Sequence, residues 1–166
     1  MARDMVKNVV IVCCGNPLAG DDGVGSRIAR GLERALREGH VCGENVLLVD
    51  AGTPGLGLID VIRGKDLAIV VDGVKSGSAP GTVITGRVEE TIPKIRRGWS
   101  LHSLGVPEAL ELGRLVEPDD MPRDILFVGV EVGDAAPGKV GLTPPVESAV
   151  PQAVEEIIRL INENAV

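Results

Sequence analysis

Aromatic side chains are almost absent from this sequence, which has one Trp, one Phe and no Tyr among its 166 residues. The core must therefore be built from Val, Ile, Leu and Ala. Proteins that bind single-stranded nucleic acids stack bases on aromatic rings, and this chain has too few rings for that. Its formal net charge of −7 at pH 7 would also repel a phosphate backbone. We expect no nucleic acid among its partners.

Long apolar runs are also missing. No stretch approaches the roughly 20 consecutive apolar residues that a membrane-spanning helix needs. The charged N-terminal residues are not followed by the apolar segment of a signal peptide. We expect no membrane partner and a cytoplasmic location. A chain of this length has the size of one domain with a real core, so we predict a single domain over residues 1–166.

Cysteine is scarce, and the three cysteines lack the paired spacing of a metal-binding motif: Cys13, Cys14 and Cys42. An odd number of cysteines without a signal sequence is typical of a reducing compartment. Free cysteines are usually small buried hydrophobic residues, and we expect the same here. Cys13 and Cys14 are neighbours on a predicted strand, so their side chains should point to opposite faces of a sheet.

What the sequence does contain is an alternation of apolar, strand-like runs with amphipathic helical stretches. Several runs are apolar at every position, which is typical of parallel strands covered on both faces. The pattern predicts strands over 8–14, 46–50, 67–72, 82–88 and 124–130, and helices over 22–38, 58–62, 104–112 and from 144 onward. The run 82–88 alternates in polarity, which indicates an edge strand and is compatible with an antiparallel orientation. The fold class is α/β, with three layers and a mostly parallel sheet between helices.

A glycine-rich turn with two adjacent acids joins the first predicted strand to the first predicted helix. It reads Cys14-Gly15-Asn16-Pro17-Leu18-Ala19-Gly20-Asp21-Asp22-Gly23-Val24-Gly25. Such turns normally collect anions on backbone N–H groups at the positive end of the helix dipole. Because two carboxylates already stand there, we expect the ligand to be a cation rather than a phosphate.

Other ionisable residues follow the ends of the predicted strands. In an open α/β sheet, ligands bind at the carboxyl ends of the strands. Asp50 and Asp72 end the second and third strands, and His102 precedes a predicted helix. Together with Asp22 they are a suitable ligand set for a divalent transition metal. A lone histidine can equally be structural, and Asp72, after five apolar residues, needs a charged partner.

Two of the acids have a purely structural alternative. Asp21 has the position of an N-cap for the first helix, which makes Asp22 the better ligand candidate. Asp50 has the position of a turn residue that accepts N–H bonds from Gly52 and Thr53.

The glycine turn also permits a nucleotide-binding interpretation. Gly15 and Gly20 have the spacing of a P-loop, but Asp21 and Asp22 stand where Lys and Ser or Thr should be. Asp50 has the position of the ribose-binding acid of a dinucleotide fold. A nucleotide-binding α/β domain is therefore an alternative, although two acids at the phosphate position argue against it.

Five segments between residues 8 and 160 resemble, in order and spacing, the motifs of the endopeptidases that mature nickel–iron hydrogenase large subunits. Residues 15–25 resemble that family's G-N-x-L-x-x-D-[DE]-G-x-G signature. Its D-x-G-T segment is similar to Asp50-Ala51-Gly52-Thr53, and its third-strand acid with a P-G-T turn is similar to Val71-Asp72 with Pro80-Gly81-Thr82. Its S-x-H-x-x-G element is similar to Ser100-Leu101-His102-Ser103-Leu104-Gly105. Its G-L-[ST]-x-x-V segment is similar to Gly141-Leu142-Thr143-Pro144-Pro145-Val146. The Cys-Gly-Asn opening is similar to the branch that serves coenzyme F420-reducing hydrogenases.

The resemblance implies a twisted five-stranded sheet and an enzyme that removes the C-terminal extension of a hydrogenase large-subunit precursor after nickel insertion. It implies that nickel held in the precursor is the recognition element, contacted by Asp22, Asp72 and His102. The same ligands would accept other divalent metals. The family often has Glu where Asp22 stands, so this ligand is one methylene shorter. The residues matching the segment linked to substrate recognition and cleavage are Asp50, Ala51, Gly52 and Thr53.

Two mechanisms are open for such an enzyme. The metal polarises the scissile carbonyl or activates a water with a carboxylate as base, or the metal only docks the precursor and a carboxylate activates the water. No Ser/His/Asp or Cys/His nucleophile set is evident, which favours aspartyl-type chemistry. The candidate catalytic residues are Asp22, Asp50, Asp72 and His102. A non-catalytic nickel-binding assembly chaperone with the same site is the further alternative.

Overall fold

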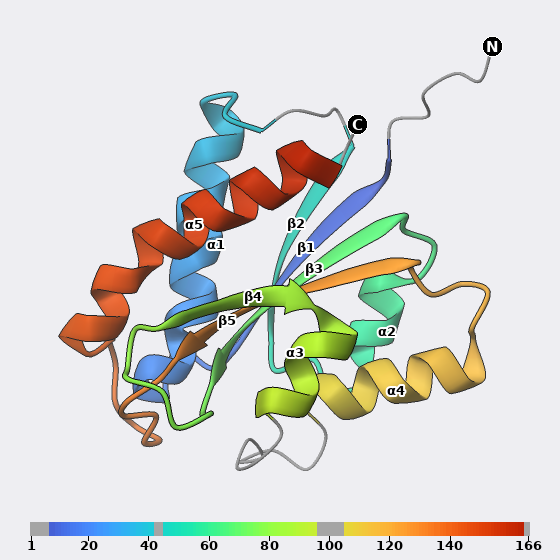
Figure 1. Cartoon of the computed structure of the whole chain (residues 1–166). Helices are drawn as coiled ribbons and strands as arrows, with labels where there is room; N and C mark the ends of the chain where they lie inside the picture. The colour runs from blue at the N-terminus through green and yellow to red at the C-terminus, as the bar shows by residue number, and fades with distance from the viewer. Residues whose placement is uncertain (1–6, 42–44, 96–104, 165–166) are drawn as a thin grey trace.

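The computed structural model describes residues 7–41, 45–95 and 105–164, and in these ranges it contains a five-stranded sheet (Figure 1). The strand order is β2-β1-β3-β5-β4. Four strands are parallel, and β4 at the edge is antiparallel to β5. The strands are β1 (Val9–Cys14), β2 (Val46–Gly52), β3 (Leu67–Val74), β4 (Val83–Arg87) and β5 (Asp124–Glu131). The predicted sheet and its antiparallel edge strand are confirmed.

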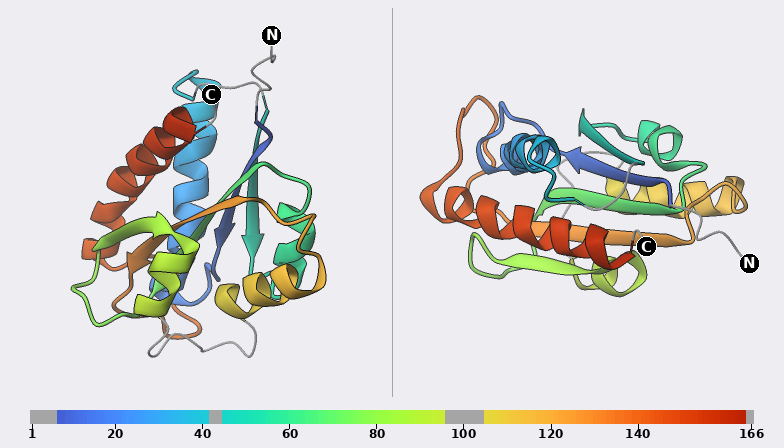
Figure 2. Two further views of the ribbon diagram at one scale, coloured as in Figure 1. Left: turned by 45° about the vertical axis from the view of Figure 1, so that its right-hand side comes forward. Right: turned by 90° about the horizontal axis from the view of Figure 1, so that it is seen from above.

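Helices cover both faces of this sheet, which confirms the three-layer prediction (Figures 1 and 2). One face carries α1 (Val24–Arg37) and α5 (Pro144–Asn164), and the other carries α2 (Gly57–Ile62), α3 (Val88–Ile95) and α4 (Val106–Val116). A short 3-10 turn, η1 (Gly20–Gly23), precedes α1. Among the described residues, no helix combines the length and the apolar character needed to cross a membrane.

The hydrophobic core consists of two aliphatic clusters separated by the sheet. Every residue of β1 and of β3 is buried, and successive side chains alternate between the clusters. Cys13 belongs to the cluster under α1 and α5, whereas Cys14 belongs to the opposite one. The prediction that they point to opposite faces is confirmed, and both are free thiols. Cys42 lies outside the described residues.

Helix α3 is the main element that the sequence pattern missed. The predicted edge strand ran to Val88, but the chain turns there into an eight-residue helix that contains Pro93. Its β-branched residues and proline give it weak helix propensity. It forms because Val88, Ile92 and Ile95 share one face and become buried against the sheet. Burial in the tertiary structure thus outweighs the local preference.

Candidate functional site

The carboxyl ends of β1, β2 and β3 bring the predicted acids to one edge of the sheet. Cys13, near the end of β1, pairs with Asp50 on β2 and with Val71 on β3. Asp50 and Asp72 therefore flank the end of β1. Asp22 comes from η1, the turn that follows β1. The three acids thus lie at one edge of the sheet, although β2 and β3 each continue two residues beyond Asp50 and Asp72.

The glycine turn folds back on itself so closely that its glycines cannot carry side chains. Gly15 has a φ of +133°, and a Cβ there would lie 2.0 Å from the Asp22 carbonyl oxygen and 3.9 Å from Asp72 Oδ1. Gly25 at the start of α1 approaches the Cys14 carbonyl oxygen just as closely. The absence of side chains at these glycines lets the turn close up, with Asp22 near the end of β1 and its charge acting on Asp72.

Asp72 is buried next to the charge of Asp22. It is 9% exposed, and its Oδ1 accepts a hydrogen bond from the Gly73 N–H at 2.8 Å. Burial, and after it the negative charge of Asp22, raise the pKa of Asp72 to about 8. The carboxyl is therefore largely protonated at neutral pH unless a cation compensates it. Perturbed, adjacent carboxyls of this kind are typical of catalytic and metal-binding sites.

Asp22 is tied to the turn that carries it. One of its carboxylate oxygens accepts a hydrogen bond from the Asn16 N–H at 2.9 Å. Its side chain is only half-buried. A ligand from outside can therefore reach Asp22 more readily than Asp72.

Asp50 does not act as the turn residue that its position suggested. Strand β2 continues to Gly52, so Asp50 lies within the strand, and its carboxylate accepts hydrogen bonds from Ser26 Oγ of α1 at 3.0 and 2.9 Å. The expected N–H bonds from Gly52 and Thr53 are therefore wrong. The exposed carboxylate of Asp50 is oriented by helix α1.

Asp21 does not cap a helix, contrary to the prediction. Neither η1 nor α1 has a side-chain cap. The fully buried Asp21 instead accepts hydrogen bonds from the Gly133 and Asp134 N–H groups at 2.9 Å and from Thr143 N–H at 2.6 Å, and its carboxylate also accepts from Thr143 Oγ1. Burial alone would raise the pKa of Asp21, but these hydrogen bonds outweigh it and the pKa is lowered. Asp21 anchors the glycine turn to the C-terminal third of the chain.

Glu131 is a second buried anchor at this edge, and the sequence analysis missed it. It is 3% exposed, and it accepts hydrogen bonds from Ser76 N–H, Ser76 Oγ and Gly77 N–H. It therefore fixes the loop that follows β3 and Asp72. A lone Glu at a strand end carries no sequence signal for such a role.

His102 lies outside the described residues. Within the described parts of the chain, no group of three or more His, Cys, Asp or Glu side chains could hold a metal ion. The described part of the predicted ligand set is therefore the pair Asp22 and Asp72. The neighbouring thiols of Cys13 and Cys14 are poor nucleophiles, because burial raises the pKa of both.

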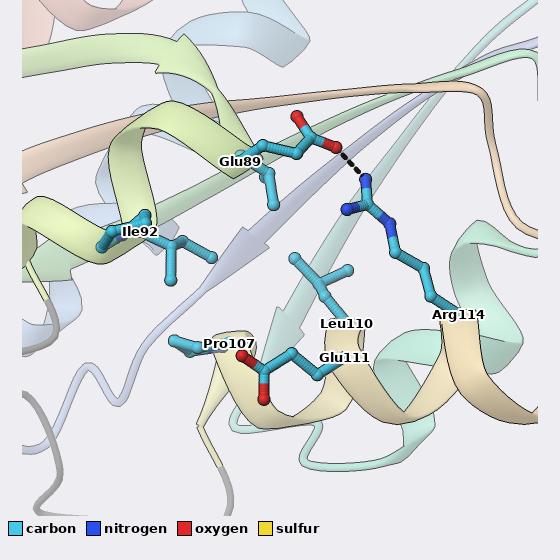
Figure 3. A pocket seen from close by; sticks show the side chains of 8 residues that line it. Glu89, Ile92, Pro107, Leu110, Glu111 and Arg114 are labelled. Atoms are coloured by element: carbon cyan, nitrogen blue, oxygen red, sulfur yellow. Dashed lines mark hydrogen bonds and ion pairs between the residues drawn. The ribbon is translucent and has the colours of Figure 1, made fainter.

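A groove between α3 and α4 contains none of the predicted site residues (Figure 3). Ile92, Pro107 and Leu110 give it an apolar floor, and Glu89 pairs with Arg114 across it. Glu111 also lines it. The groove is therefore separate from the carboxyl ends of the strands, where Asp22, Asp50 and Asp72 lie.

Comparison with known proteins identifies the family. The family model for HycI, hydrogenase maturation protease, matches residues 26–160. The chain belongs to the hydrogenase maturation protease family.

Two relatives of this maturation protease match over nearly their whole length. It is 29% identical to the hydrogenase 2 maturation protease of Escherichia coli (strain K12), over 95% of this chain and 93% of the relative. It is 32% identical to the coenzyme F420 hydrogenase subunit delta of Methanothermobacter thermautotrophicus, over 90% and 92%. The structure of the hydrogenase maturating endopeptidase HybD from E. coli superimposes with a TM-score of 0.79 at 29% identity, covering 94% and 93% of the two chains.

These matches confirm the resemblance, the α/β fold and the enzyme class. The protein is an endopeptidase of hydrogenase maturation rather than a non-catalytic chaperone.

Replacing Asp21 with Ala should destabilise the maturation protease by about 3 kcal/mol. The substitution removes a buried acceptor and leaves the N–H groups of Gly133, Asp134 and Thr143 without their hydrogen-bond partner. Urea unfolding at pH 7 measures this loss. Asp50→Ala, which removes an exposed carboxylate, is the control and should cost less than about 1 kcal/mol. Equal losses in the two variants would contradict the anchoring role.

Asp72→Asn should stabilise the metal-free protein at alkaline pH. The folded-state pKa of Asp72 is raised from 3.8 to about 8, so Asp72 increasingly destabilises the wild type as pH rises from about 4 to about 8. Asn does not titrate. Urea unfolding in chelator should therefore show similar stabilities near pH 4 and an advantage for the variant, on the order of a few kcal/mol, at pH 8.5. A stability difference that does not change with pH would rule out the raised pKa.

Proposed function

We propose that this protease removes the C-terminal extension of a nickel–iron hydrogenase large-subunit precursor after nickel insertion, and that nickel carried by the precursor is what it recognises. The observation that carries the proposal is the pair Asp22 and Asp72 at the carboxyl ends of the strands, in a chain of this family. The names of its relatives support the substrate, since one matures hydrogenase 2 and another is a subunit of the F420 hydrogenase.

The electrostatics of the carboxyl pair support a cation as the recognised group. Asp72 is buried beside the charge of Asp22, which keeps its pKa near 8. A divalent metal ion offered by the precursor would compensate both charges, and Asp72 would then lose its proton. Carboxylate oxygens and imidazole nitrogens are suitable ligands for such an ion. His102, which lies outside the described residues, is the third proposed ligand on the strength of the family motif.

The proposed chemistry is attack of a water molecule on the scissile carbonyl. A carboxylate takes one proton from the water as the oxygen adds to the carbonyl carbon, and this proton then passes to the leaving nitrogen as the C–N bond breaks. Asp22 and Asp72 are the candidate bases, and the nickel of the precursor would orient or polarise the carbonyl. Asp50 and the exposed residue Thr53, with Ala51 and Gly52, are proposed to hold the substrate chain.

Removing a proposed ligand should abolish processing. Asp22→Asn, Asp72→Asn and His102→Ala should each slow cleavage of a nickel-loaded precursor about 100-fold or more, because each removes a metal ligand or base. Mass spectrometry of the precursor, following loss of its C-terminal peptide, measures the rate. Asp119→Asn is the control, since Asp119 is exposed in the turn between α4 and β5. Wild-type rates for the three variants would refute the residue assignment.

Nickel in the precursor should decide whether cleavage occurs. The wild-type enzyme should cut the nickel-loaded precursor and leave the nickel-free one intact, because the carboxylates would then lack their compensating charge. The same mass assay on both precursors measures this. Equal cleavage of the two would refute nickel as the recognition element while leaving the protease function intact.

A further inference from the structure

Two large apolar side chains are exposed on the glycine turn and on the segment bridged to it. Leu18 is 62% exposed and Val140 is 82% exposed. They lie on neighbouring segments, because Ala19 and Lys139 form a parallel bridge. The Gly138 N–H donates to the Leu18 carbonyl at 2.8 Å. We call these two side chains the Leu18–Val140 surface.

The backbone beneath this surface is firmly held. Gly20 N–H donates to the Lys139 carbonyl and Asp21 N–H to the Asp134 carbonyl, both at 2.8 Å. The buried carboxylate of Asp21 adds its own bonds to the segment that leads to Val140. Scattered exposed apolar residues are ordinary in proteins. Here, however, they are presented on a cross-linked frame, and a pre-organised surface loses little conformational entropy when a partner binds.

A single residue connects this surface to the carboxyl pair. Asn16 donates its N–H to Asp22 Oδ2 at 2.9 Å, and its Oδ1 accepts the Leu18 N–H at 2.9 Å. The Asp22 N–H in turn donates to the Ala19 carbonyl at 3.1 Å. Leu18 thus lies at the outside of the same compact turn that holds Asp22. A protein that presents a group to Asp22 would be in position to contact Leu18.

We propose that the Leu18–Val140 surface docks an apolar segment of the large-subunit precursor and thereby presents the bound metal to Asp22 and Asp72. This inference rests on the function proposed above. The occupant is the precursor because the surface is continuous with the residues proposed to receive its metal. Docking at this surface contributes to the affinity for the precursor, not to the chemical step, so it acts on KM.

The chain offers a matched control at the far end of the sheet. Leu115 and Val116, at the end of α4, are 80% and 64% exposed. An ion pair between Arg63 and Glu117 places this end of α4 beside the approach to β3, at the amino ends of the strands. These two residues have the same side chains as the proposed surface and lie away from the carboxyl pair.

The experiment compares two uncharged double variants, Leu18→Gln/Val140→Thr and Leu115→Gln/Val116→Thr, with the wild type. Cleavage of nickel-loaded precursor is followed over a range of precursor concentrations. The first variant should lose about tenfold in kcat/KM through a raised KM, with kcat retained, because two apolar contacts are removed. The control should match the wild type. Melting temperatures of both variants, at exposed positions, should stay close to that of the wild type.

Three outcomes would contradict the docking role. An unchanged kcat/KM in the first variant, an equal loss in the control, or a loss confined to kcat would overturn it. Direct binding of the precursor separates this failure from failure of the proposed function. If the wild type binds the precursor but does not cut it, and only the first variant binds more weakly, the docking role is supported and the proposed cleavage is contradicted. If the wild type neither binds nor cuts the precursor, both proposals fall.

Discussion

The buried carboxylate of Asp21 is the interaction on which the arrangement of the site depends. It collects hydrogen bonds from residues 112 to 122 positions further along the chain. An anion with no exposure to water is tolerated only when its oxygens are fully hydrogen-bonded, and here backbone N–H groups and a hydroxyl supply those bonds. The contact joins the glycine turn to the segments before α5, and so gives a rigid base both to Asp22 and to the Leu18–Val140 surface.

Two aspartates at this edge of the sheet, Asp21 and Asp72, have pKa values shifted in opposite directions. Asp21 has a lowered pKa because many donors meet its charge. Asp72 has a raised pKa because burial removes water and Asp22 adds a like charge. The single hydrogen bond from the Gly73 N–H lowers the pKa but does not outweigh these two effects. The fold thus stabilises one anion and leaves the other short of positive charge. This unfavourable pairing is consistent with a site that binds a cation only when its substrate brings one.

Much of this molecule follows from local patterns. Continuous apolar runs predicted the buried strands, alternating polarity predicted the edge strand, and the two-residue period of a strand placed Cys13 and Cys14 in different clusters. The strand pattern also indicated the edge of the sheet at which Asp22, Asp50 and Asp72 lie. Helix α3 was not predicted because its helix propensity is weak and its formation depends on burial against the sheet. Asp21 was misassigned because a cap needs only near neighbours, whereas its true partners are remote.

The sequence by itself determined the strands and most of the helices, the edge at which the acids gather, and the family, because these depend on residue type and spacing along the chain. Only the tertiary structure decided that Asp21 anchors distant segments, that Asp50 is held by Ser26, and that Glu131 fixes the loop after β3. It also decided that burial and the charge of Asp22 raise the pKa of Asp72. Hydrogen-bond partners and local dielectric depend on which remote segments meet in space. Two adjacent aspartates, alike in the sequence, therefore acquired different environments: Asp21 is buried and holds the glycine turn in place, whereas Asp22 is half-buried and lies beside Asp72.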